Sequence, residues 1–234
     1  MSKNIKANER LIVALDVPTV PEAQQIVETL GESVVFYKIG LELFMSGEYF
    51  ELLNWLSAQD KKIFVDLKFF DVPATVGRAV AQLNGKGVTF ATIHGNDSIM
   101  KAAAANKGDV QILAVTVLTS LDRGDLKDLG FECDVQELVL SRAKRAVEIG
   151  CDGVVASGHE AQAMREKLGE SFLVITPGIR PVDNDDDQKR VVTAAQAFTN
   201  GADYIVVGRP IRDAENPRAA ADKLQAEISA IFDV

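Results

Sequence analysis

Short apolar runs alternate with longer amphipathic stretches along the chain, and this alternation limits the possible fold more than any other feature. The runs are rich in β-branched residues and nearly continuous, which is typical of strands covered on both faces. We expect strands at residues 11–15, 34–39, 63–67, 89–93, 112–117, 153–156, 173–176 and 204–207. We expect helices at residues 21–30, 49–58, 73–84, 98–106, 135–149, 160–168, 194–200 and 217–231.

Strict alternation of this kind predicts an α/β fold of the (β/α)8 TIM-barrel class, with a single domain over residues 1–234. The length of 234 residues is close to the roughly 250 residues of such barrels. The alternative is a doubly wound parallel sheet, which usually has a glycine-rich first turn. Here the first turn is Asp16-Val17-Pro18, and the chain has no GxGxxG or Walker A sequence, so the barrel is favoured.

Composition excludes several classes of partner. The chain has 25 Lys and Arg against 34 Asp and Glu, a formal charge of −9, which argues against nucleic acid or an anionic membrane. Small anionic ligands remain compatible with this charge. The two cysteines, Cys133 and Cys151, predict neither a disulfide framework nor a zinc site. The first apolar run is too short for a signal peptide or a membrane span, so we expect a cytoplasmic protein.

Charged residues gather where the first three expected strands end. They are Asp16, Lys38, Asp66 and Lys68, and Asp71 follows closely. That face of a barrel carries the active site, and residues two apart in a strand point to the same side, so Asp66 and Lys68 should project together into the barrel mouth. Carboxylates beside Lys68 favour its ammonium form, which suits a general acid or an electrostatic clamp better than a Schiff base. A structural ion pair, with Asp71 as a helix N-cap, is the alternative interpretation.

A second group of residues follows the last two expected strands. The sequence PGIR runs from Pro177 to Arg180, and Gly208 and Arg209 follow the eighth strand. Barrels frequently bind phosphate with these two loops, so a phosphate monoester is the favoured ligand. Arg209 as a surface ion-pair partner is the alternative.

Other features point less clearly to function. The connections at 119–134 and 177–193 are long for this fold, which is typical of loops over a ligand site, although simple insertions are the alternative. The acidic run 183–187 lacks the glycine and glutamate of a calcium loop and is interpreted as a solvated segment. His94 ends the fourth expected strand, where a general base and a structural histidine are equally compatible with the sequence.

Taken together, these motifs resemble one enzyme family. The sequence DLKFFDVP at residues 66–73, with Lys38 before it and PGIR and GRPI after it, closely resembles the orotidine 5′-phosphate decarboxylase family. The similarity extends from Ala14 to Ile211. It implies a TIM-barrel homodimer without metal or organic cofactor, which converts the nucleotide orotidine 5′-monophosphate to uridine 5′-monophosphate in de novo pyrimidine synthesis.

The resemblance also implies roles for individual residues. Lys68 matches the lysine that protonates the carbon left by CO2, Asp66 and Asp71 match the carboxylates beside it, and Lys38 completes the charged group. Asp71 and Thr75 are implied to reach into the partner subunit's site. The implied substrate contacts are Asp16, Lys38 and Asp66 near ribose and the reacting carbon, Thr119 and Ser120 at the pyrimidine, Gln188 between base and phosphate, and Pro177, Arg180, Gly208 and Arg209 at the phosphate.

The sequence departs from the family pattern at one position, and two alternative functions remain open. Phe70 stands where many family members have histidine, at a position that is not itself catalytic. A magnesium-dependent decarboxylase of the 3-keto-gulonate 6-phosphate type shares the DxKxxD motif but resembles this chain less, since it has an acidic metal ligand in place of Lys38. A non-catalytic nucleotide-binding barrel would be expected to have lost part of the DxKxxD triad, which is intact here.

Overall fold

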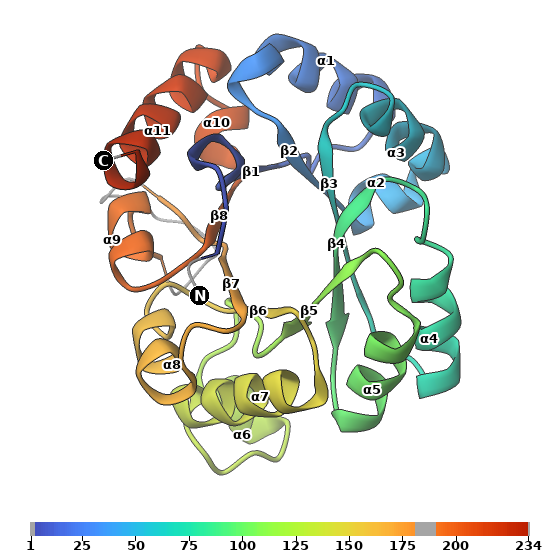
Figure 1. Cartoon of the computed structure of the whole chain (residues 1–234), viewed down its shortest axis with the longest axis vertical. Coiled ribbons are helices and arrows are strands. Elements are labelled where there is room, and N and C mark those ends of the chain that lie inside the picture. Colours follow the sequence, from blue (N-terminus) through green and yellow to red (C-terminus); the bar gives the residue numbers. More distant parts are fainter. Residues whose placement is uncertain (1–2, 181–190, 234) are drawn as a thin grey trace.

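The computed structural model describes residues 3–180 and 191–233, in which parallel strands form a closed barrel surrounded by helices (Figure 1). Each strand pairs with its neighbours in sequence, and β8 closes the ring by pairing with β1, so the open doubly wound sheet is excluded. The strands are β1 Leu11–Ala14, β2 Phe36–Gly40, β3 Lys62–Phe69, β4 Val88–His94, β5 Gln111–Val115, β6 Gly153–Val155, β7 Leu173–Thr176 and β8 Tyr204–Val207.

The helices form the outer ring in Figure 1. They are α1 Val20–Leu30, α2 Leu41–Met45, α3 Tyr49–Ser57, α4 Pro73–Ala81, α5 Asp97–Asn106, α6 Arg123–Asp128, α7 Val135–Ile149, α8 Ala161–Leu168, α9 Ala194–Thr199, α10 Arg209–Arg212 and α11 Pro217–Phe232, with short 3-10 turns at Ala7–Glu9 and Gly31–Ser33. Among the described residues, none of these helices combines the length and the apolar character needed to cross a membrane.

Local signals in the sequence set several helix ends. Pro217 is the first residue of α11, and the side chain of Asn216 accepts the amide hydrogen of Ala219, as expected for an N-cap. Gly150 ends α7 with φ of +97°, a left-handed conformation that glycine adopts without strain. The long connection 119–134 is not a simple loop, because it contains α6, which Asp122 and Asp125 begin with a capping box.

Two apolar layers stabilise the barrel. The larger layer lies between strands and helices, and the smaller one fills the barrel interior. Four aromatic side chains form much of the interior: Phe36, Phe64, Phe90 and Tyr204. The ring centres of Phe36 and Phe90 are 5.2 Å apart, and those of Phe90 and Tyr204 are also 5.2 Å apart, in the tilted and edge-to-face arrangements that aromatic rings prefer. This packed interior closes the barrel beneath its mouth.

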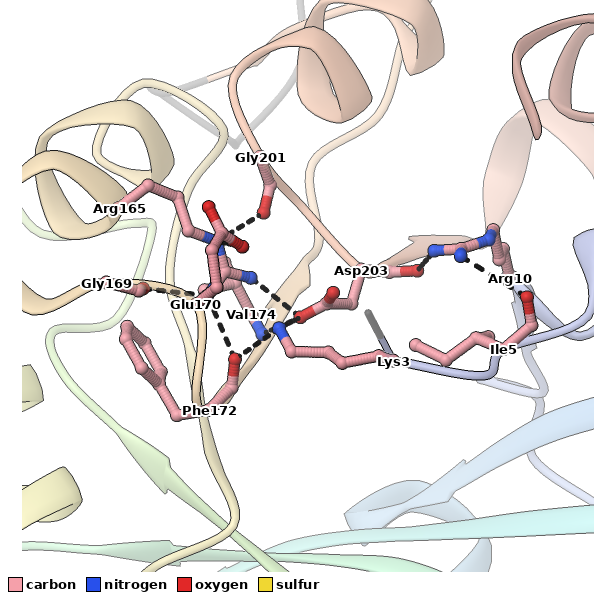
Figure 2. Close-up of polar contacts among 10 residues, drawn as sticks. All are labelled: Lys3, Ile5, Arg10, Arg165, Gly169, Glu170, Phe172, Val174, Gly201 and Asp203. Carbon is pink, nitrogen blue, oxygen red and sulfur yellow. Dashed lines mark hydrogen bonds and ion pairs between the residues drawn. The ribbon is translucent and has the colours of Figure 1, made fainter. Parts of the chain in front are cut away.

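A buried ion cluster lies at the end of the barrel opposite to its mouth. It joins the N-terminal segment to the residues where β7 and β8 begin (Figure 2). One oxygen of Asp203, Oδ2, lies 2.6 Å from Lys3 Nζ and 2.7 Å from Arg165 Nη2, and it also accepts the amide hydrogen of Val174 at 2.8 Å. The carbonyl oxygen of Phe172 accepts hydrogen bonds from both cations. We call Lys3, Arg165 and Asp203 the basal ion cluster.

We predict that Asp203→Ala lowers the free energy of unfolding by about 3–5 kcal/mol, because it leaves two largely buried cations without their carboxylate. Urea denaturation measures this loss. Glu170→Ala is the matched control: its carboxylate also contacts Arg165, at 3.3 Å, but it is 70% exposed, so its loss should cost less than about 1 kcal/mol. Equal losses in the two variants would contradict a stabilising role for the basal ion cluster.

Candidate active site

A cavity of about 780 Å³ opens at the C-terminal ends of the strands, the end opposite to the basal ion cluster. Phe64, Val155 and Val206 line its apolar part and belong to or pack against the interior core, which therefore forms the floor of the cavity. The predicted site residues that line the same cavity are Asp16, Lys38, Asp66, Lys68, Thr119, Pro177, Arg180, Gly208 and Arg209. Residues from six of the eight strand ends or the loops that follow them therefore meet at one place.

Two lysines and two aspartates form a continuous charged array, composed of Asp16, Lys38, Asp66 and Lys68. Lys38 Nζ lies 2.9 Å from Asp16 Oδ1 and 3.3 Å from Asp66 Oδ2. The other oxygen of Asp66, Oδ1, lies 2.9 Å from Lys68 Nζ. Asp66 thus bridges the two ammonium groups, and the exposed fraction of the side chain rises from 11% at Lys38 to 33% at Lys68. Both lysines line the cavity, and Lys68 is the more exposed of the two.

Strand register places these charges together. Gly40 in β2 pairs with Asp66 in β3, and Lys38 lies two residues before Gly40 on the same side of β2. A Cβ atom at Gly40 would lie 3.4 Å from Asp16 Oδ1 and 3.5 Å from Lys38 Nζ. These are ordinary van der Waals distances, so the ion pair between Asp16 and Lys38 packs directly against the backbone at Gly40.

The array is electrostatically balanced. Burial alone would raise the pKa of Asp66, but Lys38, Lys68 and hydrogen bonds from Lys68 and Thr92 outweigh burial and hold the pKa below its ordinary 3.8. Burial would lower the pKa of Lys38, but Asp66 and Asp16 outweigh it and raise that pKa above 10.5. Asp66 therefore contributes stability at every pH above 3.8, and the contribution is lost as the pH falls through its lowered pKa.

The path of β3 differs from the expected regular strand. Asp66 and Lys68 both line the cavity, as predicted. Lys68 has φ of +48°, which is not an extended conformation, so the regular alternation of a strand does not explain why the two side chains lie on the same side. The pairing between β3 and β4 shifts register between Val65 and Phe69, as in a β-bulge. Thr92 in β4 bonds to both charged residues at this point, with 2.9 Å from its Oγ1 to Asp66 Oδ1 and 2.9 Å to the amide nitrogen of Lys68.

Arginines occupy another wall of the cavity. Arg180 is only 6% exposed, and its Nη1 donates to the carbonyl oxygen of Ile179 at 2.9 Å. Its amide nitrogen donates to the carbonyl of Val192 at 3.1 Å, which fixes the start of the loop after β7. Arg209 is the first residue of α10 and is half-buried at the cavity rim, beside Arg212. These guanidinium groups give the cavity a cationic side that suits phosphate.

Three predicted site residues, all within the described part of this chain, do not line the cavity. Asp71 is exposed, and its Oδ1 accepts the amide hydrogen of Val72 at 2.6 Å; Val72, not Asp71, is the N-cap of α4. Thr75 is half-buried in α4, and Ser120 is exposed beyond β5. Gln188 and the acidic run 183–187 lie outside the described residues.

His94 lies at the end of β4 but does not line the cavity. Burial, followed by the charges of Arg142 and Lys68, lowers its pKa, and its ring packs edge-on against Phe70. Its Nδ1 has no hydrogen-bond partner among the described residues. No group of three His, Cys, Asp or Glu side chains that could hold a metal ion occurs within residues 3–180 and 191–233.

Sequence reasoning missed three residues of this site: Gly40, Thr92 and Arg212. Thr92 is two residues from Phe90, which faces the barrel interior, so a polar residue on an inward face was the available signal. Gly40 follows Lys38 by the same spacing. Arg212 shares the short helix α10 with Arg209, and no periodic pattern marks a helix of that length.

We predict that Asp66→Asn lowers the free energy of unfolding by about 3 kcal/mol at pH 7, because the Lys38 ammonium stays buried with only half-exposed Asp16 as partner. Without the Asp66 charge, burial should bring the pKa of Lys38 below 10.5, so the deficit relative to wild type should shrink when urea unfolding is repeated at pH 10. A deficit that stays constant between these pH values would show that the Lys38 charge is not its cause.

Comparison with known proteins identifies the family. Residues 9–224 match the family model described as "Orotidine 5'-phosphate decarboxylase / HUMPS family". The chain is 66% identical over 233 residues to an orotidine 5′-phosphate decarboxylase of Methylococcus capsulatus, covering 99% of this chain and 96% of the relative. It is 52% identical over 229 residues to one of Stenotrophomonas maltophilia, covering 97% and 95%. A crystal structure of orotidine 5′-phosphate decarboxylase from Lactobacillus acidophilus superposes with a TM-score of 0.83 at 36% identity, covering 94% of this chain and 99% of that one. The barrel and its charged cavity therefore belong to a member of the orotidine 5′-phosphate decarboxylase / HUMPS family.

Proposed function

We propose that this protein decarboxylates orotidine 5′-monophosphate to uridine 5′-monophosphate. The observation that carries the proposal is the bridge of Asp66 between Lys38 and Lys68 on the wall of one cavity, with Arg180 and Arg209 on another wall. A nucleotide presents both features that this arrangement matches, a reacting ring and a distant phosphate. The high identity of relatives that carry the decarboxylase name supports the same activity.

Lys68 is proposed to act on the carbon that loses its carboxyl group. As the bond between the ring carbon and CO2 breaks, the electron pair stays on the carbon and cannot delocalise into the ring π-system. An ammonium held nearby stabilises this charge and then donates a proton to the carbon, so that a new C–H bond replaces the broken C–C bond. Lys68 suits this role because Asp66 fixes its ammonium at 2.9 Å, while a third of the side chain stays open to the cavity.

The arginine wall is proposed to supply binding energy far from the reacting carbon. Arg180 and Arg209 would hold the phosphate, with the backbone of Pro177 and Gly208 beside them. Asp16 and Lys38 would contact the ribose, and Thr119 the pyrimidine, while Ser120 and Gln188 stay predictions for the pyrimidine side and the base-to-phosphate bridge. Binding energy from such remote groups orients the substrate and lowers the barrier at the reacting centre.

The second candidate is a magnesium-dependent sugar-phosphate decarboxylase, because the matching family model includes a second branch. In this chain the ammonium of Lys38 lies between the carboxylates of Asp16 and Asp66, at 2.9 and 3.3 Å. A divalent cation at that place would have to displace a buried ammonium from both partners, so the array favours the metal-free reaction. All four residues of the charged array are present. Their presence also disfavours the other alternative, a non-catalytic barrel that only binds a nucleotide.

A homodimer is proposed from the surface next to the array. Phe70 is 69% exposed and Val72 is 63% exposed, and Asp71 lies between them outside the cavity of its own chain. Covering this apolar pair with a second copy would let Asp71 and Thr75 complete the partner's site, as the family resemblance implies. We further propose the cytoplasm as the location, where free cysteines such as Cys133 and Cys151 persist.

We predict that Lys68→Ala reduces decarboxylation at least about 1,000-fold, because one group supplies both charge stabilisation and the proton. Loss of orotidine 5′-monophosphate absorbance after addition of protein measures the reaction. Lys62→Ala is the matched control, since Lys62 lies at the other end of the same strand and pairs with Glu9. Wild-type activity should be unaffected by EDTA. Inactive wild-type protein, or wild-type activity that needs magnesium, would refute the proposal.

We predict that Val72→Glu separates the dimer and reduces turnover at least about 10-fold, because it places a charge in the proposed apolar contact and removes Asp71 and Thr75 from the partner's site. Sedimentation velocity and the absorbance assay measure the two effects on the same samples. Ile231→Glu is the control, because Ile231 is 40% exposed and belongs to α11, which lies on the other side of the barrel from α4 in Figure 1. A monomeric variant with full activity would show that the partner contributes nothing to the site.

A further inference from the structure

The C-terminal part of β3 contains two more residues than the segment of β4 beside it. Val65 pairs with Ala91, and Phe69 pairs with Ile93. Three residues of β3 therefore lie opposite one residue of β4, which is Thr92. An insertion of this kind interrupts the regular backbone ladder and re-aims the side chains that it contains.

The inserted residues include Asp66 and Lys68, the two members of the charged array that β3 supplies, and one of them has an uncommon backbone conformation. Lys68 has φ of +48°, in the left-handed region that residues other than glycine seldom adopt. Such conformations persist where the surroundings hold them, and they cluster at functional sites. The direction of the Lys68 side chain depends on this conformation, because φ sets where the Cβ atom points.

The hydroxyl of Thr92 connects the two charged groups. Its Oγ1 accepts the amide hydrogen of Lys68 at 2.9 Å and donates to Asp66 Oδ1 at 2.9 Å. The same Asp66 oxygen accepts from Lys68 Nζ, also at 2.9 Å. Thr92 is fully buried and does not line the cavity, so solvent does not compete for these bonds. Backbone, carboxylate and ammonium are thus linked through one hydroxyl group.

We propose that Thr92 is a positioning residue for the decarboxylation: its hydroxyl holds the inserted turn of β3 in the conformation that aims Lys68 at the reacting carbon and orients Asp66 between the two lysines. The inference rests on the proposed function, in which Lys68 stabilises and protonates that carbon. Thr92 touches neither the cavity nor the arginine wall, so it acts on the chemical step and not on phosphate binding.

Thr92→Val tests the role of the hydroxyl group with little change in shape, because valine has a methyl group in place of the hydroxyl. We expect kcat to fall at least about 10-fold, the effect of losing hydrogen bonds to a charged group, while KM for orotidine 5′-monophosphate stays within about 3-fold. Thr92→Ser keeps the hydroxyl and should stay within about 3-fold of wild-type kcat. A kcat for Thr92→Val within 3-fold of wild type would overturn the proposal.

Thr176→Val is the matched control. Thr176 is also a fully buried threonine in a barrel strand, but its Oγ1 has no hydrogen-bond partner among the described residues. Its kcat should equal that of wild type. If Thr92→Val does not fold, Thr92→Ser and Thr92→Ala make the same comparison, since they differ by the hydroxyl alone. Serine and alanine variants with equal kcat would overturn the proposal, because packing and not the hydroxyl would then matter.

The outcome separates this inference from the proposed function. Wild-type protein that does not act on orotidine 5′-monophosphate refutes the proposed function, and the role of Thr92 with it. Active wild-type protein with an unimpaired Thr92→Val variant refutes the role of Thr92 alone. Selective loss of kcat in the variants that lack the hydroxyl, with thermal midpoints close to those of Thr92→Ser, supports it.

Discussion

Asp66 forms ion pairs with two ammonium groups at once, and the chemistry proposed for the cavity depends on that shared carboxylate. A buried lysine or a buried aspartate alone would be strongly unfavourable. Together, Asp66 and Lys38 keep each other charged, as the lowered pKa of the first and the raised pKa of the second indicate. The remaining oxygen of Asp66 then holds Lys68 where the cavity is open. A fixed positive charge at that position needs no reorganisation when the reaction begins.

The barrel separates the parts that stabilise the fold from the parts proposed to react. At one end, the basal ion cluster ties the N-terminal segment to the start of β7 and β8. In the middle, the aromatic side chains around Phe90 fill the interior. At the other end, β3 departs from regular pairing, and Lys68 adopts a left-handed conformation. Strain of this kind costs about 1–3 kcal/mol, which a closed and well-packed barrel offsets elsewhere.

The sequence was most informative about features that repeat along the chain. Continuous apolar runs predicted each strand to within a few residues, because strands buried on both faces need such runs. Helices of four to six residues, α2, α6, α9 and α10, have little periodicity, and of these only α9 was expected. Asp66 and Lys68 were correctly placed together, although the expected reason, regular alternation, was wrong. The insertion in β3 has no signature in a single sequence, since it arises from the register with β4. Thr92 is a polar residue on an inward face, which was an available signal, but its bonds to Asp66 and Lys68 could not be predicted without the insertion. Asp71, Thr75 and Ser120 are not brought to the cavity by this chain alone, so their roles stay predictions.

A crystal structure with bound uridine 5′-monophosphate tests the central claim most directly. The account predicts that Lys68 Nζ lies about 3–3.5 Å from the ring carbon that loses the carboxyl group, while Asp66 still bonds to both lysines. The phosphate should lie against Arg180 and Arg209. A structure in which the Lys68 amine turns to solvent, or in which Asp66 releases either lysine to bind the nucleotide, would contradict the account.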